Sequence, residues 1–512
     1  MNHLLVLPII LPALTAALLL LCGPRPVFSR SISFVSTALL LVVSMLLLKD
    51  AATGAFQTYA LSDWAAPFGI ILVLDRLSGL MVLLTAVVAL AALFYAMQGW
   101  DTRGRYFHAL FQFQLMGING AFLTGDLFNL FVFFEVLLIA SYCLLMYGFG
   151  ERRLRASVHY VAINLTGSAV FLIAVSLLYS VTGTLNMAHL AEVVAQSPPA
   201  DIALIRSSGL MLLGVFGIKA ALFPVYFWLP AAYSSASAPV AALFAIMTKV
   251  GVYSILRFTT LIFAGTSDAS ADLTTPWLLP LALMTLALAT LGALAAKRLL
   301  ELFAYLTIAS VGTILIAVSA GGVAGLSGGL FYLVHSTLII SALFLLAEMI
   351  GQARGDAQEQ LHSGPELLQS ARLGIAFLIG AVIVAGLPLS SCFLAKLMIL
   401  QSAINSPQMP WVWGTILGAS LLTLIGLARA GSMMFWKTSH AASSQAVSPT
   451  GLQWLPVVGL LALSVLMVVY AAPIKRYTDA TAQQLKNPSE YITAVIGKTP
   501  DRAPRLLPIE AK

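Results

Sequence analysis

Long apolar runs, separated by short polar segments, follow one another along almost the whole chain. Each run approaches the ~20 residues that an α-helix needs to cross a bilayer. The pattern therefore predicts an all-α integral membrane protein with about fourteen transmembrane helices, with boundaries good to about four residues. The predicted spans are 4–22, 31–48, 70–97, 107–125, 127–148, 157–180, 209–229, 237–260, 276–296, 299–319, 325–349, 372–403, 412–435 and 452–472.

The polar interruptions indicate loops and one tail, and none is long enough for a second domain. They are 189–207, 351–371, the serine-rich stretch 438–450 and the end of the chain. We therefore expect one polytopic transmembrane domain over 1–475 and a C-terminal tail over 476–512. The first apolar run lacks a preceding basic residue and a following small-residue cleavage site, so we interpret it as a span.

Composition agrees with a membrane protein: 60% of the residues are hydrophobic and 9% are charged, against roughly 25% charged in soluble domains. The net charge of +7 is spread over loops between the spans, so we expect no nucleic-acid partner. The three cysteines form no CxxC or Cys/His cluster, and the chain has no P-loop or Rossmann glycine pattern. We expect no cofactor.

Basic residues gather in every second loop. Eleven follow odd-numbered spans and three, Lys49, Arg206 and Arg257, follow even-numbered ones. The positive-inside rule then places the odd-to-even loops in the cytoplasm and both termini on the outer side. The basic tail is an exception to this pattern. The eleven are Arg25, Arg30, Arg103, Arg105, Arg152, Arg153, Arg155, Lys297, Arg298, Arg354 and Arg372.

Five ionisable residues lie near the middle of otherwise apolar spans: Glu135, Lys219, Lys249, His335 and Lys396. A charge at the bilayer centre costs ~2.5–3.5 kcal/mol on insertion scales, so such groups are functional candidates. One lysine alone could snorkel to the interface or pair with a carboxylate to stabilise the bundle. A static role does not suit the set, because one glutamate cannot neutralise three lysines. At least two lysines must be hydrated or neutral part of the time, as a proton path requires.

Helix-breaking residues accompany two of the lysines. Pro224 follows Lys219 by five residues, and Gly386-Leu387-Pro388 lies eight to ten residues before Lys396. A proline inside a span removes a backbone hydrogen bond, and a plain structural kink is the alternative interpretation. Because broken helices line ion sites in transporters built from inverted repeats, we expect helices 4–8 and 9–13 to form two such repeats.

A second group of polar residues carries weaker signals. Asp75 and Arg76 begin the third span as an adjacent pair of opposite charge, and Asp126 stands at a helix start, so capping or interface roles are at least as plausible as transport. Three further residues lie near predicted span ends and are interpreted as interfacial: His108, His159 and Glu348.

Two segments closely resemble the D subunit of multisubunit Mrp/Pha-type cation/proton antiporters: GINGAFLTGDLFNLFVFFEVLLIASYCLLMYG (117–148) and GIKAALFPVYFWLPAAYSSASAPVAALFAIMTKVGVYSILR (217–257). The resemblance covers about residues 1–475. More broadly, the chain is similar to the antiporter-like subunits of respiratory complex I and of membrane-bound hydrogenases. These share a WLP-A-x₆-AP-x₉-K pattern, here Trp228, Leu229, Pro230, Ala238, Pro239 and Lys249.

The resemblance implies fourteen helices, two inverted repeats each with a broken helix, and a hydrophilic axis onto which the five mid-span residues map one by one. It implies a proton-translocating subunit of a Na⁺(K⁺)/H⁺ antiporter in a bacterial cell (inner) membrane, with other antiporter subunits as partners. The alternatives are a proton-pumping membrane subunit of complex I or a hydrogenase, and a scaffold without transport. Carboxylate and carbonyl oxygens for a sodium site are scarce at mid-depth, which favours proton transport here. The tail lacks the long lateral helix of the largest complex I paralogue.

Overall fold

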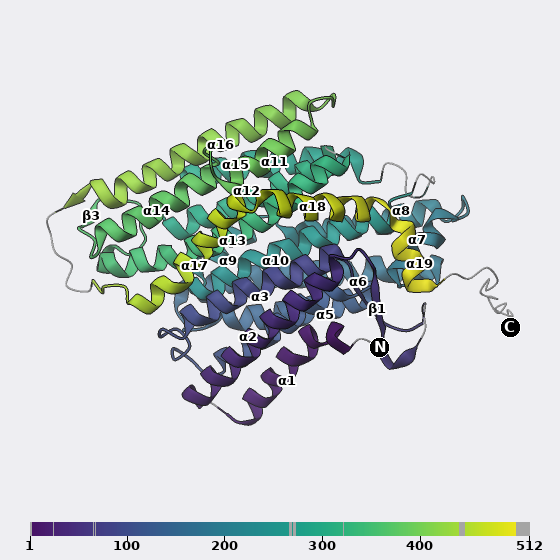
Figure 1. Cartoon of the computed structure of the whole chain (residues 1–512), viewed down its shortest axis with the longest axis horizontal. Helices are drawn as coiled ribbons and strands as arrows, with labels where there is room; N and C mark the ends of the chain where they lie inside the picture. Colours follow the sequence, from purple (N-terminus) through teal and green to yellow (C-terminus); the bar gives the residue numbers. More distant parts are fainter. Residues whose placement is uncertain are drawn as a thin grey trace.

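The computed structural model describes residues 3–23, 25–64, 66, 68–265, 269, 273–320, 322–439 and 446–497. It is a bundle of α-helices with two very short strand pairs (Figure 1). The helices of the N-terminal half are α1 (Leu7–Leu21), α2 (Pro26–Ala51), α3 (Arg76–Ala96), α4 (Phe107–Leu123), α5 (Leu127–Met146), α6 (Glu151–Thr182), α7 (Met187–Ala195), α8 (Ile202–Ala220), α9 (Trp228–Ser235) and α10 (Ala238–Arg257). The others are α11 (Thr275–Ala295), α12 (Leu299–Ala320), α13 (Gly322–Arg354), α14 (Ser370–Ala385), α15 (Ser391–Ser402), α16 (Met409–Gly431), α17 (Gly451–Val469), α18 (Ala471–Lys486) and α19 (Pro488–Ile496).

Each predicted span coincides with a helix or with a pair of half-helices. Eleven helices of the described residues are long and apolar enough to cross a membrane. The other three predicted spans correspond to α1, to α4 and to the pair α14–α15, which are shorter. The prediction of an all-helical membrane protein is confirmed. The short strands were not predicted: β1 (Gln57–Ala60) pairs antiparallel with β2 (Ile71–Leu74), and β3 (Gly364–Pro365) pairs parallel with β4 (Thr438–Ser439).

Two spans are broken where the prolines indicated. The first consists of α8 and α9, joined by 221–227, and the second of α14 and α15, joined by 386–390. Backbone groups left free by a break inside a membrane need new partners. Here the indole of Trp228 donates to the carbonyl of Ile218 at 3.1 Å, and the Phe223 amide donates to the Thr285 hydroxyl at 2.9 Å. The breaks fall in the fourth member of each predicted five-helix repeat, and the inverted relation of the repeats stays a prediction.

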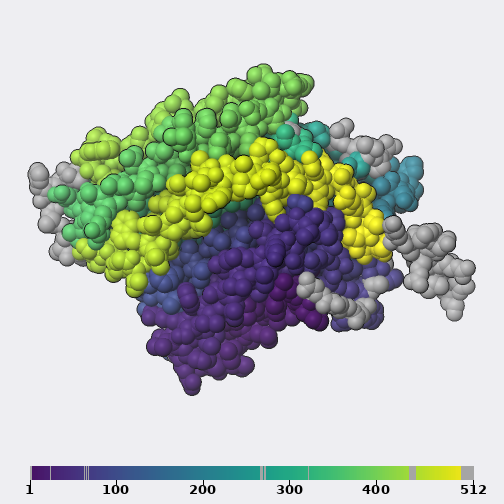
Figure 2. Space-filling view, viewed as in Figure 1, coloured from purple at the N-terminus to yellow at the C-terminus, as the bar shows by residue number. Residues whose placement is uncertain are grey.

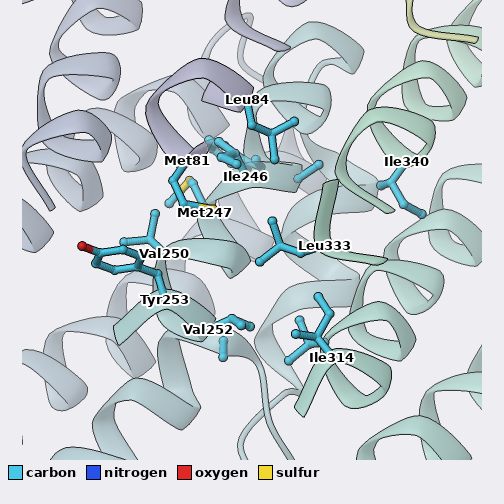
Figure 3. Packing of buried hydrophobic residues seen from close by; sticks show 14 of the residues in the cluster. Met81, Leu84, Ile246, Met247, Val250, Val252, Tyr253, Ile314, Leu333 and Ile340 are labelled. Carbon is cyan, nitrogen blue, oxygen red and sulfur yellow. The ribbon is translucent and has the colours of Figure 1, made fainter. Parts of the chain in front are cut away.

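The centre of the bundle is α10, every residue of which is buried. Figure 3 shows side chains of α10, such as Ile246 and Val250, packed among residues of α3, α12 and α13. The polar side chains of α10 are thereby kept away from lipid: Thr248, Lys249, Ser254 and Arg257. Lys249 belongs to this helix and is 0% exposed, so the fold places one of the predicted lysines at its most enclosed position.

Helical structure extends beyond the last predicted span. The α17–α18 segment runs antiparallel along α13: Gln453 bonds Gln352, and farther along Thr478 bonds Ser327. Thr478, Thr481, Ala482 and Leu485 are buried at the i, i+3, i+4, i+7 spacing of a helix face. In Figure 2 the C-terminal residues form a yellow band between the purple N-terminal helices and the green ones. The sequence predicts only a C-terminal tail over 476–512, because this segment is largely polar.

Asp75 and Arg76 do not act as a pair. The Asp75 carboxylate accepts from the Ser78 amide at 2.8 Å, which caps α3, and from Arg257 of α10 at 2.6 Å. Both partners of this second bond are buried. The capping role is therefore confirmed, and the buried ion pair with Arg257 is a tertiary contact that neighbouring sequence positions could not indicate.

Asp101, in the loop between α3 and α4, holds the ends of α2 and α4 together. Its carboxylate accepts from Arg30 at 2.5 and 2.8 Å and contacts His108 at 3.1 Å. Burial of the Asp101 carboxyl opposes its ionisation, but the hydrogen bonds from Arg30 and His108 outweigh burial and lower its pKa to about 2. His108 is thus a buried partner of Asp101 at the start of α4.

We expect Asp101→Asn to destabilise the protein at pH 7 by about 1–2 kcal/mol, because Arg30 is partly exposed and water screens the pair. A depressed carboxyl pKa stabilises the fold above the unfolded value of about 3.9, and that stabilisation is lost as pH falls towards 2. The melting temperature of Asp101→Asn should lie below that of wild type. This difference should be largest at pH 7 and should shrink below pH 4. The exposed Glu151 changed to Gln is the control, and equal melting of wild type and Asp101→Asn at pH 7 would refute the assignment.

Candidate functional site

Glu135 and Lys219 are linked through two polar residues of α6. The Ser168 hydroxyl donates a short hydrogen bond to the Glu135 carboxylate and lies 3.0 Å from the carbonyl of Asn164. The Lys219 ammonium donates to the side-chain oxygen of Asn164 at 3.3 Å. Glu135 also attracts Lys219 electrostatically, although no direct ion pair joins them among the described contacts. The result is an ordered chain from carboxylate to amine across α5, α6 and α8.

The position of Lys219 depends on the first helix break. Lys219 is the second-to-last residue of α8. Ala221, which follows the end of the helix, has a left-handed conformation with φ +60°. Gly251 of α10 lies against this helix end: a β-carbon on Gly251 would stand 2.4 Å from the amide nitrogen of Ala220. Only glycine permits this approach, which brings the helix that carries Lys249 against the end of the helix that carries Lys219. No hydrogen bond between the two described lysines is present.

Lys249 is bonded to a neutral oxygen of the neighbouring helix. Its ammonium donates to the hydroxyl of Ser310 on α12 at 2.6 Å, and that hydroxyl also lies 2.6 Å from the carbonyl of Thr307. Ser310 in turn lines a small cavity between α11, α12, α13, α14, α15 and α16. The cavity offers about 30 Å³, which is room for roughly two water molecules.

His335 and Lys396 line the same cavity as Ser310. The Nδ1 atom of His335 lies 2.8 Å from the hydroxyl of Ser391, at the first residue of α15. The Lys396 ammonium donates to the hydroxyl of Ser420 on α16 at 2.8 Å. Both lysines, Lys249 and Lys396, are close enough to act on the imidazole electrostatically. The cavity is therefore polar and small, and bound water in it can connect the three groups.

The second helix break sets the position of Lys396. Gly386 ends α14 with φ +81°, and a β-carbon there would meet the Lys396 ammonium nitrogen at 3.4 Å. The hydroxyl of Ser390 caps α15 by accepting from the Phe393 amide at 3.2 Å. The break thus lets the lysine side chain lie against the end of the preceding half-helix.

The predicted residues fall into two groups: Glu135 with Lys219, and Lys249 with His335 and Lys396. The neutral polar side chains that bond to these ionisable residues were not predicted, because only ionisable side chains were taken as candidates. Their positions in the sequence could have indicated such a role, because four neutral polar residues lie in the middle of apolar spans: Asn164, Ser168, Ser310 and Ser420. Other serines of these helices, such as Ser180 and Ser319, bond only their own backbone, so sequence alone could not single these four out.

The polar residues with weaker sequence signals have structural roles. Glu348 lies in the last turns of α13, on the wall of a cavity that opens to the surface. Its carboxylate accepts from the Trp100 indole, from the Ala238 amide at 3.3 Å and from the Gln352 side chain at 3.0 Å. Asp126 caps α5 by accepting from the Asn129 amide at 2.8 Å, as predicted. His159 is exposed and bonds the carbonyl of Arg155 at 3.2 Å. Within the described residues, no group of three or more His, Cys, Asp or Glu side chains is arranged to hold a metal ion.

Comparison with known proteins gives one consistent family. Residues 124–425 match the family described as NADH:quinone oxidoreductase/Mrp antiporter, transmembrane. The chain is 40% identical over 530 residues to the D subunit of a probable K⁺/H⁺ antiporter of Rhizobium meliloti, covering 97% of this chain and 98% of that one. It is 36% identical to the D subunit of the Na⁺/H⁺ antiporter of Bacillus subtilis, covering 97% and 100%. A chain of the Mrp complex structure from Dietzia superposes with a TM-score of 0.84 at 27% identity, covering 97% and 100%.

Proposed function

Because the chain belongs to the NADH:quinone oxidoreductase/Mrp antiporter transmembrane family, we propose that it is the proton-conducting D subunit of a multisubunit Na⁺/H⁺ or K⁺/H⁺ antiporter. The two relatives named above are 40% and 36% identical to this chain over nearly their whole length and are antiporter subunits by name. That likeness favours an antiporter over a redox-driven pump, whose membrane subunits share the fold. The other subunits of the complex would then be its partners.

One observation supports proton conduction more than any other. Lys219, Lys249 and Lys396 each donate to a neutral oxygen, on Asn164, Ser310 and Ser420 respectively. None of the three forms a direct ion pair within the described part of the chain. Burial disfavours a charged amine, whereas a nearby carboxylate favours it. Amines without a carboxylate in contact can release a proton, so these lysines suit a relay better than a static charge network.

The proposed path runs from the Glu135–Ser168–Asn164–Lys219 chain to Lys249 and Ser310, and then through the water-sized cavity to His335 and Lys396. Histidine can accept and donate a proton near neutral pH, which suits the middle of the path. The positive-inside count supports an orientation with the ends of α3, α5 and α11 in the cytoplasm and both termini outside. We assign no cation route to this chain.

Lys219→Arg distinguishes a relay from a structural charge. Arginine keeps the positive charge but does not lose its proton in proteins. A relay predicts that Lys219→Arg loses cation/proton exchange almost as fully as Lys219→Ala, by at least about tenfold. A structural charge predicts that arginine restores most of the activity. The measurement is Na⁺- or K⁺-dependent dissipation of a pH gradient in everted vesicles containing the assembled complex, normalised to complex content.

A further inference from the structure

A large polar cavity lies at one end of the bundle, away from the lysines. It has a volume of about 480 Å³ and opens to the surface. Its walls come from the loop after α3, from the first residues of α6, α10 and α12, and from the last turns of α13. Arg103, Arg152, Arg153 and Arg298 line it, and no lysine does. The proton path proposed above does not use this cavity.

The residues that line the cavity carry a net charge of +1, from four arginines and three glutamates. Four guanidinium groups face it, and three helices, α6, α10 and α12, begin at its wall with their positive dipole ends. Of the three carboxylates, Glu359 pairs with Arg298 and lies 3.9 Å from Arg152, and Glu151 pairs with Arg155 outside the cavity. Glu348 accepts hydrogen bonds from the neutral groups of Trp100, Ala238 and Gln352. Arg103 and Arg153 form no ion pair among the described residues. The excess of guanidinium groups and the three helix starts favour an anion over a cation at this wall.

Several hydrogen-bond donors in the walls have no protein acceptor. The Ser237 side chain is 2% exposed, and its hydroxyl has no hydrogen-bond partner among the described residues. The Nη1 atom of Arg298 is also buried without one. The Arg103 guanidinium stacks on the Trp100 ring at 3.8 Å, which fixes its plane and leaves its N–H groups available. Buried donors of this kind normally have an acceptor.

We propose that this cavity binds a phosphate-bearing anion, with Arg103, Ser237 and Arg298 as its main donors. Arginine forks match phosphate oxygens in pairs and are preferred over lysine for such recognition. Basic pockets between transmembrane helices bind the head groups of anionic lipids, and the same donors would hold a free phosphate. Because the anion would lie at the start of α10, the helix that carries Lys249, occupancy would stabilise the arrangement of α10 and α13.

The test is thermal melting of the delipidated complex in detergent, with two probes. One probe is inorganic phosphate, compared with chloride at equal ionic strength. The other is short-chain phosphatidylglycerol, compared with phosphatidylcholine of the same chain length. A saturable rise in melting temperature with phosphate identifies a free anion, and a rise with phosphatidylglycerol alone identifies a lipid head group. If neither probe stabilises the complex, or if phosphatidylcholine acts as well as phosphatidylglycerol, the proposal is wrong.

Two single substitutions test whether the anion binds in this cavity. Arg103→Gln removes a charge-assisted donor and should weaken binding at least tenfold. Ser237→Ala removes only the unpartnered hydroxyl and should weaken binding about fivefold. Arg105→Gln, on the same loop but outside the cavity, is the control and should bind like wild type. Wild-type affinity in both Arg103→Gln and Ser237→Ala would show that the anion binds elsewhere.

Discussion

Glu135→Ala is expected to abolish cation/proton exchange while leaving the complex assembled. Glu135 is the acidic end of the chain through Ser168 and Asn164 to Lys219, and its charge favours the protonated form of that lysine. The loss of about 1.4 kcal/mol of electrostatic attraction already changes a proton affinity tenfold, and attraction between opposite charges in a medium of low dielectric constant can exceed this even without direct contact. Exchange in vesicles should fall at least tenfold at equal complex content.

Asp126→Ala is the matched control, because Asp126 is a carboxylate at the start of the same helix. It caps α5, so its loss should cost about 1 kcal/mol of stability without interrupting the chain to Lys219. Exchange by Asp126→Ala should therefore stay within a few-fold of wild type. Near-normal exchange in an assembled Glu135→Ala complex would exclude Glu135 from the proton path.

The span pattern was predictable because a membrane restricts the possible structures. Backbone groups in lipid must be bonded within their own helix, so apolar length and proline positions carry most of the information. The C-terminal helix α18 was not predictable in this way. One face of this helix, formed by Thr478, Thr481 and Ala482, is buried. Its polar composition, however, resembles that of a solvent-exposed tail. Its order depends on tertiary contacts with α13 and with the start of α3, where Tyr477 donates to the carbonyl of Arg76 at 2.8 Å.

The ionisable members of the candidate site were predictable from the cost of placing charge at mid-span. Their connections were not, because they depend on which helices touch. Ser168 and Asn164 matter only since α6 lies between α5 and α8, and Ser310 matters only since Lys249 reaches α12. The close approach of α8 and α10 at Gly251 is likewise a tertiary property. The bonds that Glu348 accepts from Trp100 and Ala238 are tertiary contacts of the same kind.

The cavity shared by Ser310, His335 and Lys396 makes the second half of the proposed path the more sharply testable one. Between Ser310, which is bonded to Lys249, and the side chains of His335 and Lys396, the cavity has room for roughly two water molecules. Water can replace a neutral group in such a chain, whereas it cannot replace a group that must hold the proton as a cation. His335 and Lys396 should therefore respond differently to removal.

Lys396→Ala is expected to give an assembled complex with at least tenfold lower exchange, because it removes the only lysine described on the second broken helix. His335→Ala should keep partial activity, since water can occupy the space of the imidazole and bond Ser391. Both variants should be measured by cation-dependent dissipation of a pH gradient in everted vesicles, at several pH values. Ser406→Ala, in the exposed loop after α15, is the control for changes outside the cavity. Exchange by Lys396→Ala close to that of wild type would show that protons leave the path before the second broken helix.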